Sequence, residues 1–180
     1  DIAMRAMLDP GDEVLIPQPS YVSYEPCAIL ANGTPVIIEL KEENEFRLTK
    51  EELEAAITPK TKLLVLPFPN NPTGAAITKD ELQKWVDYAN KNGAVIIYDA
   101  AYEAYITEED VPHSIFECEG ARTCAIELRS FSKNAGFTGV RLGATIIPKD
   151  LKCGDVMLHS LWARRHGTKY NGAPYIVQKA

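Results

Sequence analysis

The 180-residue sequence lacks several features that would place it in common classes of protein. It has no excess of positive charge: 19 Lys and Arg residues against 25 Asp and Glu residues give a formal net charge of −6, which argues against a nucleic-acid-binding surface. No apolar run approaches the ~18 residues of a membrane span, and no signal segment opens the chain. We therefore expect neither a nucleic acid nor a membrane as a partner.

Cysteine and histidine are also scarce, and their spacing matches no metal site. The four cysteines, at positions 27, 118, 124 and 153, form no C-x-x-C pair, and the three histidines have no ligand spacing either. A chain in which 46% of the residues are hydrophobic does not need disulfides to hold a core together. We expect reduced thiols, no metal and a cytoplasmic location.

Short β-branched runs alternate along the chain with segments of helical periodicity. Thr49 with Glu52 and Thr78 with Glu81 are capping boxes, which predict two helix starts, and Gly93 is expected to end the second helix. The predicted strands cover residues 14–16, 36–38, 63–66, 94–98, 124–128 and 140–148, and a further helix is predicted over 156–165. This alternation predicts an α/β fold with a mainly parallel sheet covered by helices on both faces.

The organisation of the chain is that of one α/β domain over residues 1–180. The length suits a single domain, and the sequence contains no internal repeat, low-complexity tract or linker. The first residue is Asp1 rather than Met, and an apolar helical stretch is already under way there. We therefore expect the chain to be an excerpt of a longer one.

Polar residues follow three successive predicted strands, at the edge of the sheet where ligands bind in open α/β folds. Asn71, Asp99 and Lys133 lie in these positions. Taken singly, Asn71 is typical of a turn, Asp99 of a helix cap and Lys133 of a solvated surface amine. Their joint arrangement predicts a site, because an ordinary fold needs none of them there.

Together these groups meet the separate requirements of one cofactor, pyridoxal 5′-phosphate (PLP). Its aldehyde needs a lysine amine, such as Lys133, and its ring nitrogen needs a carboxylate, such as Asp99, so that the ring can accept electrons. Its phosphate calls for a guanidinium and a hydroxyl. The ring oxygen needs hydrogen-bond donors, and one ring face needs an aromatic neighbour. The residues available for these last three tasks are Arg141 with Ser130, Asn71 with Tyr102, and Tyr21.

The motifs resemble those of the fold-type I, class I aminotransferases. They are Asn-Pro-Thr-Gly at 71–74, Asp-x-x-Tyr at 99–102 and Ser-Phe-Ser-Lys-Asn at 130–134, followed by Arg141. The resemblance implies that residues 1–180 are the central part of the PLP-binding large domain, a three-layer α/β/α unit without the small domain. It also implies amino-group transfer between an amino acid and a 2-oxo acid, in a homodimer whose active sites are shared between subunits.

The same resemblance assigns roles to single residues. Lys133 forms the Schiff base with PLP and moves the proton, and Asp99 contacts the ring nitrogen. The remaining assignments are Tyr102 and Asn71 at the ring oxygen, Ser130 and Arg141 at the phosphate, and Tyr21 stacked on the ring.

From residue 97 onward the sequence resembles the LL-diaminopimelate aminotransferase subgroup, which acts in lysine biosynthesis. Segments 97–106, 129–133, 136–143, 161–166 and 168–172 carry this resemblance. The subgroup implies that Asn171 helps to bind the substrate across the dimer interface. Residues 1 to 75 resemble aspartate- or aromatic-type members more generally.

Several alternatives stay open at this point. An aspartate or aromatic aminotransferase, or a carbon–sulfur β-lyase, would differ mainly in substrate pockets that lie outside these residues. The family's chains are considerably longer, and its glycine-containing phosphate turn, N-terminal arm and small domain are not in this sequence. A catalytically incomplete fragment or an aminotransferase-like ligand sensor is therefore a further alternative. A nicotinamide enzyme is disfavoured because no G-x-G-x-x-G follows a predicted strand.

Overall fold

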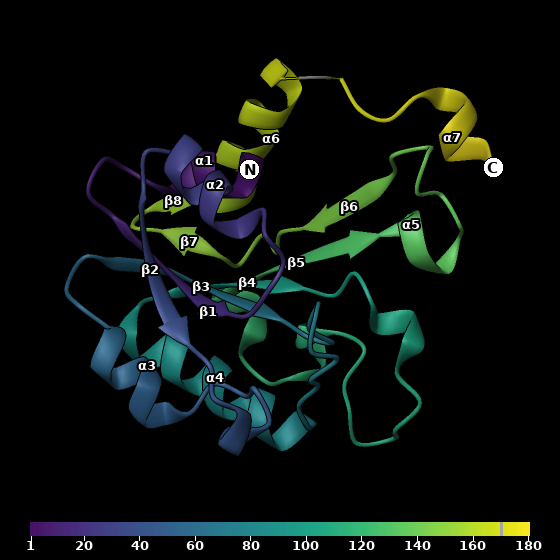
Figure 1. The fold of residues 1–180 in the computed structure, drawn as a ribbon. Coiled ribbons are helices and arrows are strands. Elements are labelled where there is room, and N and C mark those ends of the chain that lie inside the picture. The colour runs from purple at the N-terminus through teal and green to yellow at the C-terminus, as the bar shows by residue number, and fades with distance from the viewer. Residues whose placement is uncertain (170) are drawn as a thin grey trace.

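The computed structural model describes residues 1–169 and 171–180. Its centre is a sheet with the strand order β2-β1-β3-β4-β5-β6 (Figure 1). The first five of these strands run parallel to one another, and β6 is antiparallel to β5. The strands are β1 (Glu13–Gln18), β2 (Thr34–Glu39), β3 (Thr61–Pro67), β4 (Val95–Asp99), β5 (Ala125–Ser130) and β6 (Gly143–Ile146).

Helices cover both faces of this sheet, as Figure 1 shows. On one face lie α3 (Lys50–Ala56) and α4 (Lys79–Asn92), and on the other lie α1 (Ile2–Met7), α2 (Tyr24–Leu30) and α6 (Leu158–Lys169). Strand β3 contributes side chains to the hydrophobic cores on both faces of the sheet. Leu64 and Leu66 pack on one face, while Leu63 and Val65 pack on the other. Burial on both faces explains why the inner strands β1, β3, β4 and β5 contain continuous apolar runs. The predicted three-layer α/β fold is confirmed.

Both predicted capping boxes are confirmed, and they set the starts of α3 and α4. The hydroxyls of Thr49 and Thr78 accept hydrogen bonds from the N–H groups of Glu52 and Glu81 at 3.2 and 3.3 Å. The two glutamate carboxylates accept from the threonine N–H groups in return. Helix α4 ends at Gly93, whose φ of 65° lies in the left-handed region that glycine adopts without strain.

The direction in which the chain winds across the sheet reverses between β1 and β3. The chain leaves β1 through α2 on one face and returns from β2 to β3 through α3 on the other (Figure 1). Because parallel crossovers are almost always right-handed, this reversal of direction moves the helices from one face to the other. Ligands of open α/β sheets bind at such a reversal, beyond the carboxyl ends of the strands.

Two predicted boundaries in the C-terminal part are wrong. The strand expected over 140–148 is limited to β6, because the residues before it belong to a loop that turns back toward β5. The helix expected from residue 156 begins at Leu158, because β8 (Val156–Met157) pairs instead with β7 (Lys152–Cys153) across a turn at Gly154.

The remaining helical elements are short. They are η1 (Glu42–Asn44), η2 (Glu103–Tyr105), η3 (Ile115–Glu117), η4 (Ala121–Thr123), α5 (Phe131–Asn134) and α7 (Tyr175–Lys179). Among the described residues, no helix has both the length and the apolar character needed to cross a membrane.

Candidate active site

A cavity of about 410 Å³ lies at the carboxyl ends of the central strands. Its lining includes seven of the predicted site residues: Tyr21, Asn71, Asp99, Tyr102, Ser130, Lys133 and Arg141. Asn171 is not part of this lining and is exposed between α6 and α7. Its role at a subunit interface stays a prediction, and its neighbour Tyr170, in the same predicted run, lies outside the described residues.

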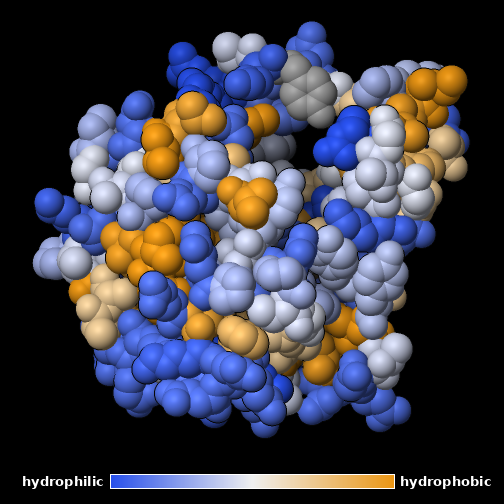
Figure 2. All heavy atoms as spheres, in the orientation of Figure 1, coloured by the Kyte–Doolittle hydropathy of each residue, from blue (hydrophilic) through white to orange (hydrophobic). Residues whose placement is uncertain are grey.

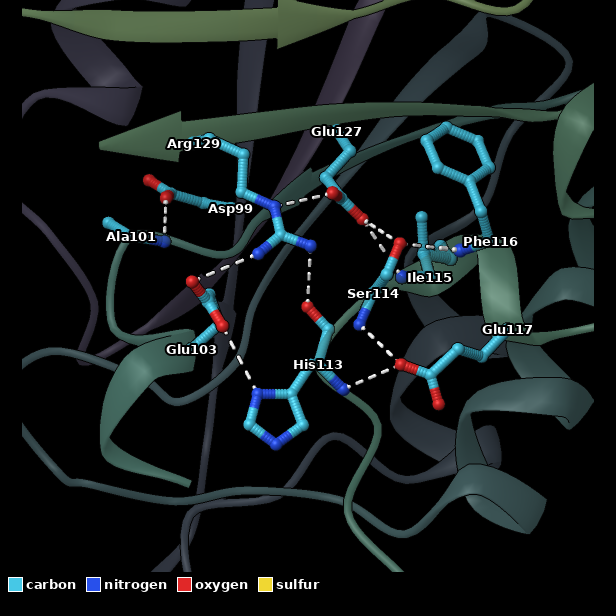
Figure 3. A network of polar contacts seen from close by, with 10 residues as sticks. All are labelled: Asp99, Ala101, Glu103, His113, Ser114, Ile115, Phe116, Glu117, Glu127 and Arg129. Atoms are coloured by element: carbon cyan, nitrogen blue, oxygen red, sulfur yellow. Dashed lines mark hydrogen bonds and ion pairs between the residues drawn. The ribbon is translucent and has the colours of Figure 1, made fainter. Parts of the chain in front are cut away.

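Asp99, the last residue of β4, is the acidic group of the cavity. Its Oδ2 accepts a hydrogen bond from the Tyr24 hydroxyl at 2.8 Å, and its Oδ1 accepts one from the N–H of Ala101 at 3.0 Å (the latter is drawn in Figure 3). Burial raises the pKa of Asp99 above its usual value, whereas both hydrogen bonds and the positive charge of Lys133 oppose the rise. Because a carboxylate oxygen has two lone pairs, Asp99 can still accept a hydrogen bond from a ligand.

Tyr24 is a site residue that the sequence analysis missed. It begins α2, is only 9% exposed, and packs edge-to-face against Tyr21 with 5.7 Å between the ring centroids. Burial first, and then the nearby charge of Asp99, raise the pKa of the Tyr24 hydroxyl, so this group stays protonated and donates. The spacing of three residues from Tyr21 was the available signal, since the first and fourth residues of a turn lie close together, and the N–H of Tyr24 donates to the carbonyl oxygen of Tyr21 at 3.3 Å.

An amine, a phenol and an amide lie close together in the lining of the cavity. Lys133 lies in α5, directly after β5, and its Nζ is 4.9 Å from the centroid of the Tyr102 ring. A cation over an aromatic face is attracted by the ring's quadrupole. The Tyr102 hydroxyl accepts a hydrogen bond from Asn71 Nδ2 at 3.4 Å. The segments that follow β3, β4 and β5 thus bring together Asn71, Asp99 and Lys133, which the sequence predicted on this edge of the sheet.

Arg141 reaches the cavity because the loop after α5 folds back on itself. The N–H of Phe131 donates to the carbonyl oxygen of Leu142 at 3.1 Å, which closes the loop. Arg141 has a φ of 64°, and its Nη1 donates to the carbonyl oxygen of Thr138 at 2.7 Å. Because a guanidinium has five N–H donors, most of them remain for an anion.

Gly143 allows this loop to run close to β5. A Cβ at this position would lie 2.9 Å from the carbonyl oxygen of Arg129, so only glycine fits without a shift of the backbone. Gly143 pairs with Ser130, whose hydroxyl accepts from the N–H of Ser132 at 3.3 Å. The close pairing thereby places the hydroxyl of Ser130 and the guanidinium of Arg141 on the lining of one cavity.

The donor set of the cavity suits an anionic organic group. It combines an amine, two guanidiniums, hydroxyls and a single carboxylate. The residues that the structure describes include no cluster of three His, Cys, Asp or Glu side chains able to hold a metal ion. A second cavity of about 690 Å³ adjoins the first and shares Pro69, Asn71 and Tyr102 with it. The site therefore has room for a small molecule next to the residues that surround Asp99.

Comparison with known proteins tests the family that the motifs predict. The family model described as aminotransferase class I and II matches residues 1–170. The LL-diaminopimelate aminotransferase of Lachnospira eligens is 71% identical over 161 residues, which are 89% of this chain and 35% of that protein. The enzyme of the same name from Prochlorococcus marinus (strain MIT 9515) is 54% identical over 158 residues, which cover 83% of this chain and 37% of that protein. The chain thus spans about a third of the length of these curated relatives.

Solved structures extend the similarity to the fold. LL-diaminopimelate aminotransferase from Chlamydomonas reinhardtii superposes with a TM-score of 0.84 at 38% identity, over 98% of this chain and 45% of that one. A mutant aspartate aminotransferase from Thermus thermophilus gives a TM-score of 0.85 at 29% identity, over 98% of this chain and 44% of that one. The family predicted from the motifs is confirmed: the chain belongs to the class I and II aminotransferases.

Proposed function

We propose that these residues form the PLP-binding part of an aminotransferase that moves an amino group between LL-diaminopimelate and 2-oxoglutarate in lysine biosynthesis. The observation that carries this proposal is that Lys133, Asp99 and Arg141 line one cavity. Relatives at 71 and 54% identity bear the name of that activity. Because the chain spans about a third of their length, the activity proposed is that of a protein of their full length.

The residues present fit the cofactor. When bound, PLP supplies an aldehyde that joins to an amine and a ring that stabilises negative charge on the substrate's α-carbon. Asp99 has free lone pairs for a ring N–H, and the Tyr24 hydroxyl, the Ala101 N–H and the charge of Lys133 favour its ionised form. The other contacts proposed are Asn71 and Tyr102 at the ring oxygen, Ser130 and Arg141 at the phosphate, and Tyr21 on the ring face.

Lys133 is the residue to which we assign the covalent and proton-transfer roles. With PLP bound, its Nζ would hold the aldehyde carbon, and the same amine, when free, would carry the proton at the substrate's α-carbon. The Tyr102 ring, 4.9 Å away, restricts where Nζ can go. A reactive amine that is held near its target in this way gains from proximity and orientation.

We also propose that the protein acts as a homodimer with Asn171 contributing to the substrate site of the partner. Several large apolar side chains are exposed, among them Val22 (81%), Leu30 (59%) and Ile176 (79%). Figure 2 shows apolar groups on the visible face, including some at the upper right, where Figure 1 places α7. Apolar patches of this kind are typical of surfaces that other protein segments cover.

The experiment that tests the function compares the wild type with Lys133→Ala. Wild-type protein mixed with PLP should gain a visible absorbance band that borohydride removes while fixing the label on the peptide that contains Lys133. The Lys133→Ala variant should lack both the band and turnover of LL-diaminopimelate with 2-oxoglutarate. The exposed residue Lys149 provides the control, since Lys149→Ala should behave as the wild type. An unchanged band and unchanged activity in Lys133→Ala would refute the assignment.

The second candidate is an aspartate or aromatic aminotransferase, which the similarity to the Thermus enzyme favours. A donor panel separates the candidates: consumption of LL-diaminopimelate, aspartate or tyrosine is measured in the presence of 2-oxoglutarate. A carbon–sulfur β-lyase would instead release a 2-oxo acid without 2-oxoglutarate. Faster consumption of aspartate or tyrosine than of LL-diaminopimelate would overturn the first proposal.

A further inference from the structure

A network of charged side chains lies against the cavity and has no part in the roles assigned so far (Figure 3). Its centre is Arg129 on β5, whose side chain is 26% exposed. The guanidinium makes three contacts to three segments of the chain: Nε donates to Glu127 Oε1 at 2.6 Å, Nη1 lies 3.1 Å from Glu103 Oε1, and Nη2 donates to the carbonyl oxygen of His113 at 2.8 Å. A planar fork of donors is well suited to join several acceptors rigidly.

One end of the network is anchored in the sheet. Glu127 is only 1% exposed, and its Oε2 accepts hydrogen bonds from the Ser114 hydroxyl at 2.6 Å and from the N–H of Ile115 at 3.0 Å. A buried carboxylate needs a positive partner and satisfied lone pairs, and Arg129 with these two donors supplies them. The contact between Arg129 and Glu127 therefore accounts for the burial of both groups.

The contact between Arg129 and Glu103 is not needed for that purpose. Glu103 is held from both sides, because its Oε1 faces Arg129 while its Oε2 lies 3.1 Å from His113 Nδ1. Its carboxylate thus has a fixed position although Glu127 already neutralises the guanidinium. A second carboxylate fixed on the same arginine calls for a reason other than the stability of β5.

The chain neighbours of this pair supply the reason. Glu103 directly follows Tyr102 in the chain. Arg129 directly precedes Ser130, and Lys133 lies four residues after Arg129. The ion pair therefore joins the two backbone segments that carry Tyr102 and Lys133, whose ring and Nζ are 4.9 Å apart. Arg129 itself also contributes to the lining of the cavity.

We propose that Glu103 and Arg129 are positioning residues whose ion pair fixes Tyr102 relative to Lys133 and thereby sets the orientation of the bound cofactor ring. The role in cofactor orientation rests on the proposed function, whereas the effect on Tyr102 does not. The hydroxyl is the group through which Tyr102 would contact the cofactor, so removal of Glu103 should cause no further loss of PLP affinity once that hydroxyl is gone.

The test is a double-substitution cycle in the full chain with Glu103→Gln, Tyr102→Phe and their combination. Charge-assisted hydrogen bonds support an expected loss of about tenfold in PLP affinity for Glu103→Gln, measured by titration of the visible band. The visible circular dichroism of the bound cofactor, which reports the ring's orientation, should change as well. The combined variant should bind PLP no more weakly than Tyr102→Phe alone.

A merely structural role gives a different result. In that case the losses of affinity in Glu103→Gln and Tyr102→Phe would multiply in the combined variant, and that outcome would overturn the proposal. Arg122→Gln is the matched control, because Arg122 and Asp150 form a pair 3.6 Å apart with both side chains about two-thirds exposed. Glu103→Gln keeps the contact between Arg129 and Glu127 that supports the fold. The test therefore needs no substitution of Arg129 itself.

A measurement without cofactor separates this proposal from the proposed function. In η2 the N–H of Tyr105 donates to the carbonyl oxygen of Tyr102 at 3.0 Å, and its hydrogen exchange reports the local order of this segment. Exchange at this amide should be faster in PLP-free Glu103→Gln than in the PLP-free wild type and unchanged in Arg122→Gln. A wild type that binds no PLP would refute the proposed function, and unchanged exchange in Glu103→Gln would refute the positioning role.

Discussion

Replacing Tyr24 with Phe removes one hydroxyl from the site and keeps the rest of the ring. The Tyr24 hydroxyl donates to Asp99 Oδ2 at 2.8 Å, and this bond lowers the pKa of Asp99 against the rise that burial causes. Without the hydroxyl the pKa of Asp99 rises further, so the ionised carboxylate becomes less favourable at neutral pH. The carboxylate should then pair less strongly with the ring nitrogen of PLP.

The size of this effect follows from the contacts that remain. A hydrogen bond to a charged group contributes about 1.5–3 kcal/mol. The lower end applies because the N–H of Ala101 still donates to Asp99 Oδ1 at 3.0 Å and the Phe ring still packs against Tyr21. A loss of about 1.5 kcal/mol corresponds to roughly tenfold weaker binding of PLP.

The assay is a spectroscopic titration of the protein with PLP over a range of pH. Tyr24→Phe should bind about tenfold more weakly at neutral pH, and the pH below which affinity declines should move upward. Tyr88→Phe is the matched control, because Tyr88 packs against the cluster under α4, on the opposite face of the sheet. If Tyr24→Phe and the control bind PLP equally well, Tyr24 does not support the charge of Asp99, and the reasoning fails.

Two further substitutions test the energetics of the site. The pKa of Asp99 is raised from 3.8 by burial, so its stabilising contribution to the free energy of unfolding is lost as pH rises from 3.8 through the raised value. Asp99→Asn should therefore make the PLP-free protein more stable than the wild type at neutral pH, while its PLP affinity falls. Urea unfolding at pH 4 and pH 7 measures this, and a stability difference between variant and wild type that is equal at both pH values would contradict it. In Gly143→Ala the new Cβ would lie 2.9 Å from the carbonyl oxygen of Arg129, so we expect the free energy of unfolding to fall by about 1–3 kcal/mol in thermal unfolding, together with weaker PLP binding. Gly139→Ala is the control: a Cβ there has nothing within 4 Å, so PLP binding should stay unchanged.

Much of the fold follows from local sequence. The apolar runs that became β1, β3, β4 and β5 are largely buried on both faces, whereas the edge strand β2 is partly exposed. Such runs of β-branched residues predict strands without any knowledge of their neighbours. The boxes at Thr49 and Thr78 predict helix starts because cap and partner lie three residues apart and need no tertiary contact. The order of strands and helices in turn placed Asn71, Asp99 and Lys133 on one edge of the sheet.

The parts that local sequence did not predict depend on contacts between distant segments. Tyr24 and Asp99 are 75 residues apart in the chain, and their hydrogen bond exists only because the fold brings the first residue of α2 to the last residue of β4. The shortening of β6 depends on how the preceding loop returns to β5, and the pairing of β8 with β7 removes two residues from the predicted helix. Propensity is a weak prior in such places, since tertiary packing overrides it.

The sequence by itself thus determined the layers of the protein, its family and the residue types on the reactive edge, because periodicity, caps and motifs act over a few residues. Only the tertiary structure decided that a phenol stabilises the buried carboxylate of Asp99 and that Arg129 joins the segments of Tyr102 and Lys133. These contacts form where segments far apart in the chain meet, so their energies depend on distance and burial, which the folded arrangement sets.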